Sequence, residues 1–290
     1  MTKAIVALSI ALVLIASALE SGTVRVPIDQ KDLEVALRGA GYGDTVLVYP
    51  GKYHIESRVR SGVKLLSAKG PDSTILWNQR WFIVMLRDCD LETQVSGFTF
   101  DGKGCNIAVA CTSGAPTITG NSIRDAWDGI NLEKCNALVK GNTVKGCNRG
   151  IAAGNSSPEL IENTLIHNIN GMYLMSASPV ISRCKIANNS KGIYVAGYSY
   201  PTIGGKLTTA NDIEQNGYNI YNDGRRVDNN LYTDQREVSI ASVNYWGSLC
   251  PSKDRFGGEV IFTPWANATH DSTYNECPKT APADTTKQHR

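Results

Sequence analysis

The sequence predicts an all-β protein, a parallel β-helix (solenoid) of about nine coils with 21 to 23 residues in each. Three observations lead to this prediction. Asn121, Asn142 and Asn163 recur at intervals of 21 residues, and a glycine followed by an apolar residue recurs at the same interval from Gly129 onward. Between them, apolar residues alternate in short pairs separated by Gly, Asn, Ser or Pro, which is the pattern of strands. The composition, with 27 glycines and only 4 methionines, favours turns and strands and excludes a helical bundle.

The repeat is a strong signal because four independent columns of similar residues recur at the same interval over four consecutive units. A unit of 21 residues cannot bury its apolar face alone, but stacked coils about 4.8 Å apart pair each strand with its copies above and below. Inward columns then become apolar stacks, and the asparagine column becomes a ladder of side-chain amides. The columns are Asn121, Asn142, Asn163 and Cys184; Gly129, Gly150, Gly171 and Gly192; Ile118, Val139, Leu160 and Ile181; and Ile123, Val144, Leu165 and Ile186.

The N-terminal residues 1–18 are predicted to be a signal peptide. Lys3 provides the positively charged N-terminal region, an apolar run extends from Ile5 to Ile15, and Ala16-Ser17-Ala18 fits a cleavage site. The apolar run is too short to span a bilayer, which needs roughly 20 residues. We therefore expect a protein without a membrane span that is secreted or located in the periplasm or extracellular space.

Residues 19–43 are expected to form an N-terminal cap. Within it, Asp29 to Arg38 is predicted to be a short helix with Leu33, Ala36 and Leu37 on one face. Such a cap covers the apolar surface and unpaired backbone of the first coil.

The parallel β-helix is expected over residues 44–240, followed by a C-terminal cap over 241–277 and a disordered tail over 278–290. Trp246, Phe262 and Trp265 are interpreted as an apolar plug for the last coil. The tail is polar and rich in Pro and Thr, which is typical of disorder.

The eight cysteines become candidates for disulfides if the chain is exported. Cys89, Cys111 and Cys135 fall near the same turn of successive coils, so either Cys89–Cys111 or Cys111–Cys135 is a candidate bridge. Cys250 and Cys277 flank the C-terminal cap and are a second candidate pair. The spacing leaves the connectivity open.

The repeat segments Gly-Ile-x-Leu and Ile-x-Gly-Asn-x-Ile, with the flanking segments 43–53, 243–247 and 260–265, carry a family resemblance. Over roughly residues 28–266 the chain resembles the right-handed parallel β-helix superfamily, the pectate-lyase-like fold of many secreted proteins. The resemblance implies a right-handed coil. It also implies that function sits on one outward strand face and its adjoining turns, where enzymes of this fold use carboxylates, Arg or Lys, and sometimes calcium.

An outward column of aromatic residues predicts a glycan-binding surface. Asn131 points outward between two inward residues, and its equivalents in later coils include Tyr173, Tyr194 and Tyr221, with Tyr198 on the next turn. A flat stripe of tyrosine faces would suit the axial hydrogens of a sugar chain, so we expect a polysaccharide or cell-surface glycan as partner. The alternative is that aromatic residues favour strands and brace one another across coils.

The polar turn before that strand predicts a second, catalytic possibility. It carries Asp125 and Asp128 in one coil, Lys145 and Arg149 in the next, and His167 in the third. A polysaccharide lyase needs a base beside a uronate and a cation to hold its carboxylate, roles for which Lys145, Arg149 and His167 are candidates. The alternative is that Asp128 and Arg149 form a surface ion pair worth less than about 1 kcal/mol.

Other classes of function are disfavoured by residue type and spacing. The outward column that starts at Asp128 and Arg149 alternates in charge, so calcium is possible but unsupported, and no cofactor is expected. The formal net charge of +2 gives no basic field for nucleic acid. The histidines occur singly, so neither a metal centre nor a resemblance to copper-associated periplasmic β-helix proteins is supported. They are His54, His167, His270 and His289.

These patterns lead to one leading hypothesis and two alternatives. The leading hypothesis is a secreted or envelope-associated protein, expected to be a monomer, that binds polysaccharide through its tyrosine-lined face. The alternatives are a polysaccharide lyase or related carbohydrate-active enzyme, and a structural or adhesive rod.

Overall fold

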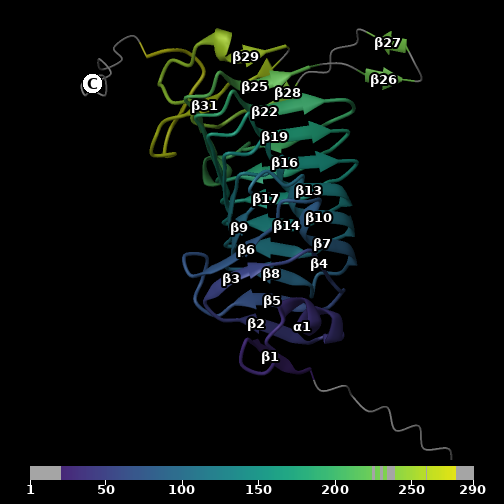
Figure 1. Cartoon of the computed structure of the whole chain (residues 1–290). Coiled ribbons are helices and arrows are strands. Elements are labelled where there is room, and N and C mark those ends of the chain that lie inside the picture. The colour runs from purple at the N-terminus through teal and green to yellow at the C-terminus, as the bar shows by residue number, and fades with distance from the viewer. Residues whose placement is uncertain (1–20, 224–225, 229–230, 234–238, 259, 279–290) are drawn as a thin grey trace, which may run out of the picture.

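The computed structural model describes residues 21–223, 226–228, 231–233, 239–258 and 260–278. The chain winds into a parallel β-solenoid in which three sheets run along the length of the molecule (Figure 1). Each coil contributes one strand to each sheet, as the repeat predicts. The predicted signal peptide and all of the predicted tail beyond Pro278 lie outside the described residues.

Three sheets, named here A, B and C, contain nearly all the strands. Sheet A comprises β1 (Thr23–Val26), β2 (Thr45–Val48), β5 (Lys64–Ser67), β8 (Gln94–Ser96), β11 (Thr117–Thr119), β14 (Leu138–Lys140), β17 (Glu159–Ile161), β20 (Val180–Ser182) and β23 (Thr202–Ile203). Sheet B comprises β3 (Gly51–His54), β6 (Thr74–Trp77), β9 (Thr99–Asp101), β12 (Ser122–Arg124), β15 (Thr143–Lys145), β18 (Thr164–Ile166), β21 (Lys185–Ala187) and β24 (Asp212–Glu214). Sheet C comprises β4 (Ser57–Val59), β7 (Phe82–Cys89), β10 (Ile107–Gly114), β13 (Asp128–Cys135), β16 (Arg149–Gly154), β19 (Asn170–Met175), β22 (Lys191–Ala196), β25 (Tyr218–Asn222) and β29 (Phe256–Gly257).

The remaining elements are short and lie mainly toward the two ends of the chain. They are α1 (Leu33–Gly39), η1 (Leu207–Thr209), β26 (Arg226–Asp228), β27 (Leu231–Thr233), β28 (Ser239–Ile240), η2 (Lys253–Arg255), β30 (Val260–Ile261), β31 (Trp265–Ala266) and β32 (Thr273–Tyr274).

The strand register reproduces the 21-residue repeat. Ile118 pairs with Val139, and Val139 pairs with Leu160, so the predicted inward column is continuous through sheet A. These three side chains are fully buried. Burial of stacked aliphatic side chains, worth about 25 cal/mol per Å² of apolar surface, is therefore the principal favourable term in each coil.

The predicted asparagine ladder is present and extends further than the sequence indicated. The Asn121 side-chain amide donates to Oδ1 of Asn142 at 3.0 Å, and Asn142 donates in the same way to Asn163 at 3.1 Å. Beyond Cys184 the ladder resumes, with Asn211 donating to Asn244 at 2.8 Å. Because these side chains are buried, the ladder satisfies polar groups that would otherwise destabilise the core.

A second ladder, which the sequence analysis missed, lies at another corner of the solenoid. Its side-chain amides connect Asn168 to Asn189 at 3.2 Å and Asn189 to Asn216 at 3.0 Å. Below them, the backbone N–H of Cys147 donates to Oδ1 of Asn168 at 3.0 Å. The signal for this ladder was the same 21-residue interval between Asn168 and Asn189.

The N-terminal helix α1 starts later than predicted. The side chain of Asp32 accepts the Val35 N–H at 3.0 Å and caps the helix, so regular helix begins at Leu33 rather than Asp29. The predicted face is confirmed, because Leu33, Ala36 and Leu37 are buried.

The other end is closed by aromatic side chains, as the sequence predicts. Trp246 and Trp265 are buried, and the rings of Phe256 and Phe262 stack with their centroids 4.2 Å apart. Trp246 meets Phe256 edge to face at 4.9 Å. These rings cover the last coil and so restrict edge-to-edge association.

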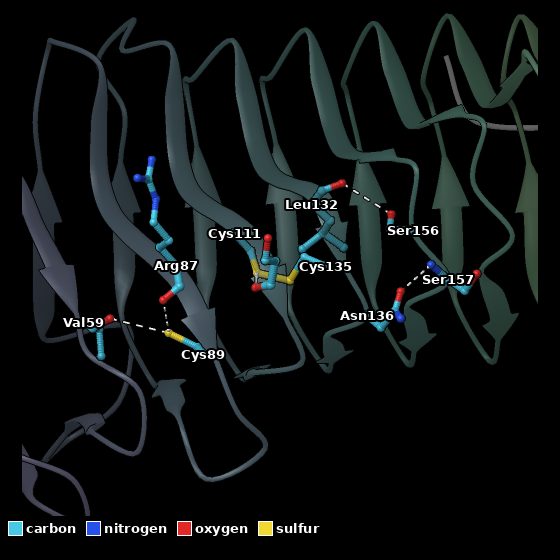
Figure 2. The surroundings of a disulfide bond; sticks show 10 residues. Val59, Arg87, Cys89, Cys111, Leu132, Cys135, Asn136, Ser156 and Ser157 are labelled. Atoms are coloured by element: carbon cyan, nitrogen blue, oxygen red, sulfur yellow. Dashed lines mark hydrogen bonds between the residues drawn. A yellow bond between two sulfur atoms is a disulfide. The ribbon is translucent and has the colours of Figure 1, made fainter.

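One of the two candidate disulfides near the same turn is confirmed. Cys111 in β10 and Cys135 at the end of β13 are bonded, with their Cα atoms 6.1 Å apart (Figure 2). Cys89 is a buried free thiol that contacts the carbonyl oxygens of Val59 and Arg87. The bridge therefore joins two neighbouring coils in the middle of the chain.

The second candidate pair, Cys250 and Cys277, consists of free thiols. Their side chains interact, and the hydrogen bond between the two thiols raises the pKa of Cys250.

The substitution Asn142→Ala tests the ladder. It removes the buried amide that accepts from Asn121 and leaves the backbone N–H of Asn121 without its partner. We expect the free energy of unfolding to fall by about 1–3 kcal/mol, measured by chemical denaturation.

Asn148→Ala in the same coil is the matched control for this measurement. Within the described residues the Asn148 side chain makes no hydrogen bond, so a change within about 0.5 kcal/mol is expected. Equal losses in the two variants would contradict a structural role for the ladder.

Candidate functional site

The outward face of sheet C holds the candidate binding residues predicted from the sequence. Strand pairing places one outward residue from each coil in a single column, and this column confirms the predicted stacking of Asn131 with later tyrosines. The column is Arg58, Met85, Ala110, Asn131, Ala152, Tyr173, Tyr194 and Tyr221.

The tyrosines of this column are stacked on one another rather than laid flat. The ring centroids of Tyr173 and Tyr194 are 5.1 Å apart with an interplanar angle of 11°, and those of Tyr194 and Tyr221 are 5.5 Å apart at 14°. Parallel rings one coil apart cover each other's faces. The expectation of a flat stripe of ring faces is therefore wrong, and the column offers ring edges and hydroxyl groups to a ligand.

The outer faces of this tyrosine stack are also covered. The Arg149 guanidinium lies 5.1 Å from the Tyr173 centroid. Gly257 packs on the Tyr221 ring so closely that a Cβ there would come within 2.4 Å of it. These contacts fix the rings, and the stack braces the last coils as the alternative interpretation expected.

The hydroxyl of the central tyrosine is engaged as well. Tyr194 donates to Oδ2 of Asp223 at 2.7 Å. Partial burial, followed by this interaction with Asp223, raises the pKa of Tyr194. Tyr194 therefore remains a neutral donor over the working range of most proteins.

The last two candidate binding residues have different surroundings. Asn131 is half-buried and donates to Oδ2 of Asp128 at 2.8 Å. Tyr198 lies in the connection between β22 and β23, outside the register of the tyrosine stack.

Asp128 and Arg149 form a bidentate ion pair between consecutive coils. Nε and Nη2 of Arg149 lie 2.5 Å and 2.6 Å from the two carboxylate oxygens. Asp128 is only 1% exposed, so the pair is more deeply buried than the surface pair expected from the sequence. Both oxygens are occupied by Arg149, and one also accepts from Asn131, so neither is available to take a proton from a substrate.

The other three candidate catalytic residues lie at one corner of three consecutive coils, at or just after the ends of β12, β15 and β18. Asp125 and His167 occupy exposed corner positions with φ of 58° and 57°. Lys145 is exposed at the end of β15, in sheet B. Within the described residues, Asp125, Lys145 and His167 form no ion pair or side-chain hydrogen bond with Asp128 or Arg149, so the five predicted residues do not form one catalytic cluster.

Two exposed tryptophans, which the sequence analysis missed, lie beside the face of sheet C. Trp81 and Trp127 directly precede β7 and β13 and are 70% and 59% exposed. Backbone bonds join Trp81 to Ile107 and Trp127 to Arg149, which places the tryptophans two coils apart in one edge column. At strand spacing this separation is about 9.6 Å.

The edge column that contains these tryptophans alternates large apolar and amide side chains. Its members are Trp81, Asn106, Trp127, Asn148 and Ile169. An open pocket beside Trp127 also has Ile169 and His167 in its lining. The signal in the sequence was the placement of both tryptophans immediately before equivalent strands.

The donor set of the described residues does not fit a metal centre. Among them, no three His, Cys, Asp or Glu side chains come together to hold an ion. His54 packs against the Trp77 ring at 4.5 Å, and His270 contacts Asp212 at 2.9 Å. His289 lies outside the described residues.

Comparison with known proteins gives one family and two distant structures. Residues 61–275 match the family described as periplasmic copper-binding protein (NosD). No curated protein matches. The fold is similar to ORF18 of Geobacillus virus E2, with 12% identity and a TM-score of 0.47 over 76% of this chain and 54% of that chain, so this chain spans about half the viral protein. It is also similar to the A-module of mannuronan C-5 epimerase AlgE4 of Azotobacter vinelandii, with 13% identity and a TM-score of 0.43 over 79% and 93% of the two chains.

The family match corrects one interpretation and confirms another. The rejection of a resemblance to copper-associated periplasmic β-helix proteins was wrong, because the match extends over the repeats that build the coils and not over a ligand cluster. The predicted location outside the cytoplasm is confirmed, since the family is periplasmic. In the part of the chain described above, no helix is long and apolar enough to cross a membrane. We derive no copper chemistry from residues that do not fit it.

The substitution Arg149→Ala tests the buried pair. It leaves the Asp128 carboxylate buried without its cation, so the free energy of unfolding should fall by about 3 kcal/mol. Adding Asp128→Asn should recover part of this loss, because the uncompensated charge is removed.

The matched control is Arg183→Ala, which breaks the exposed pair with Glu162. A loss below about 1 kcal/mol is expected for this variant in the same denaturation experiment. Similar small losses for Arg149→Ala and Arg183→Ala would contradict the structural role assigned to the buried pair.

Proposed function

Because the chain belongs to the NosD family of periplasmic β-helix proteins, we propose that it binds polysaccharide along sheet C and the adjoining edge column. The observation that carries this proposal is the pair of exposed tryptophans, Trp81 and Trp127, two coils apart. An indole ring offers an apolar face for the C–H groups of a sugar and an N–H for its hydroxyls.

The spacing of the tryptophans favours an extended glycan over a single sugar. Two coils span about 9.6 Å along the axis, comparable with two sugar units of an extended chain. Asn106 and Asn148 lie between and beyond the tryptophans in the same column and supply amide donors and acceptors. A chain running along the axis therefore meets a ring at every second sugar and an amide in between.

The tyrosine stack supports this path as a polar border. Its ring edges and hydroxyls lie on the sheet C face and begin in the coil that contributes Ile169 to the edge column. Lys191 lies 5.2 Å from the Tyr194 centroid and adds a donor at the same place. The tyrosines thus contribute hydrogen bonds to sugar hydroxyls rather than stacking surfaces.

The pairing and position of the charged residues favour binding over lyase chemistry. Asp128 and Arg149 are committed to each other, and Lys145 belongs to a different sheet. A lyase requires a base and a carboxylate-binding cation on one reacting sugar, and within the described residues neither Lys145 nor His167 contacts the Asp128–Arg149 pair. The lyase hypothesis therefore rests on the exposed corner residues Lys145 and His167 alone.

Replacement of the tryptophans tests the proposal. We expect Trp81→Ala and Trp127→Ala each to weaken retention of oligosaccharides by about 5- to 10-fold, since one aromatic contact contributes about 1 kcal/mol. Binding is measured by titration with a series of oligosaccharides of increasing length. Affinity should rise once the oligosaccharide is long enough to reach both rings.

Leu91→Ala is the control, because Leu91 is 71% exposed but lies outside the edge column. If no oligosaccharide binds, or if both tryptophan variants bind as the unsubstituted protein does, the binding proposal is wrong and the rod alternative is favoured. Thermal unfolding of each variant separates loss of binding from loss of structure.

A further inference from the structure

We propose that a second site, a cationic groove between α1 and the β3–β4 segment, binds the carboxylate or sulfate groups of an acidic glycan. The groove has a volume of about 1080 Å³ and opens to solvent near the N-terminal end of the solenoid. This inference rests on the proposed function in taking a glycan as the ligand, and it adds the charge class of that glycan. The site does not include the tyrosine stack, and it adjoins the edge column at Trp81, which lies between the lining residues Arg80 and Phe82.

Six cationic side chains line the groove and make it positively charged. All six are exposed. Some belong to the segment that carries α1 and the others to β3, β4 and the turn before β7, so cations stand on both walls. They are Lys31, Arg38, Lys52, Arg58, Arg60 and Arg80.

The acidic side chains of the groove do not neutralise these cations. Only Asp32, Glu34 and Glu56 line it. Asp32 caps α1 by accepting the Val35 N–H, and Glu34 accepts the backbone N–H of Glu56 at 2.9 Å. Six cations against three acids leave a formal charge of +3 at this one place, whereas the whole chain carries +2.

The groove cations lack ion-pair partners, unlike arginines elsewhere in the molecule. Within the described residues none of the six lies in a salt bridge, and Arg60 contacts only the carbonyl oxygen of Ala40, at 3.4 Å. Other arginines are paired, namely Arg25, Arg124, Arg149 and Arg183. Concentrated unpaired charge in a concave site attracts anions and raises their local concentration.

A buried asparagine holds part of the groove in place. Asn78 donates to the carbonyl oxygen of Ile55 at 2.8 Å, and its Oδ1 accepts the Arg80 N–H at 2.8 Å. The turn that carries Arg80 is thereby fixed to the β3–β4 connection. A fixed backbone reduces the ordering that a ligand must impose when it binds.

The chemistry of the lining selects oxyanions on a flexible chain. Guanidinium groups match the two oxygens of a carboxylate or sulfate group. A flat membrane surface cannot reach cations on both walls of a concave groove, whereas a chain can enter it. Arg58 also stands in the outward column of sheet C that leads to Ala152 and the tyrosine stack, so one chain can follow this face into the groove.

The test uses the folded full chain and probes of defined charge. The probes are a polyuronate, dextran sulfate, neutral dextran, inorganic phosphate, and vesicles containing phosphatidylglycerol. We expect the polyuronate or dextran sulfate to bind at least 10-fold more tightly than neutral dextran, and this preference should shrink as salt increases. Binding of only one charged polymer identifies the preferred group.

The double substitution Arg58→Gln and Arg80→Gln should abolish most of that preference. Arg87→Gln, an exposed arginine outside the groove, is the matched control and should have no effect. The milder Arg80→Lys variant, which keeps the charge but loses the planar fork, should retain part of the preference and guards against a folding defect.

Several results would overturn the proposal. These are equal binding of charged and neutral polymers, binding of phosphate alone, and arginine-dependent binding of vesicles without binding of polymers. Failure of the groove and failure of the proposed function are distinguishable. If charged chains depend on Arg58 and Arg80 but not on Trp81 and Trp127, the edge column is not a binding site. If the tryptophans matter and charge does not, only the groove is rejected.

Discussion

The buried asparagine ladders are the constraint on which the rest of this structure depends. Each amide joins its own coil to the next by hydrogen bonds of about 3 Å, as between Asn121 and Asn142 and between Asn168 and Asn189. A slip of one residue would bury unsatisfied amides in an apolar core, so the ladders define a single register. That register decides which outward side chains become neighbours, including the tryptophans, the tyrosines and the buried ion pair.

The sequence alone predicted the elements that depend on periodicity. The inward columns, the first ladder and the outward positions of Tyr173, Tyr194 and Tyr221 all follow from the 21-residue repeat. What it did not predict is side-chain orientation. Register places tyrosines one coil apart, but only the rotamers decide whether ring faces point to solvent or to each other. In the same way, spacing aligned Asp128 with Arg149, whereas burial of the pair depends on how the surrounding side chains pack.

The residues that the family shares and the residues of the proposed binding surfaces occupy different parts of the same repeat. The family match covers the coils, whose buried columns any member needs in order to fold. The proposed binding residues occupy exposed positions that the repeat leaves free, such as Trp81, Trp127 and the groove arginines. This separation explains why a family described by copper can include a chain whose described residues gather no copper ligands.

The central claim is that stacked coils convert a repeat in sequence into a linear track for a sugar chain. Crystal structure determination with a bound oligosaccharide tests this claim most directly. We expect the sugar chain to run along the solenoid axis, with alternate units over Trp81 and Trp127. A chain that crosses the coils at right angles, or that lies on sheet A or sheet B, would contradict it.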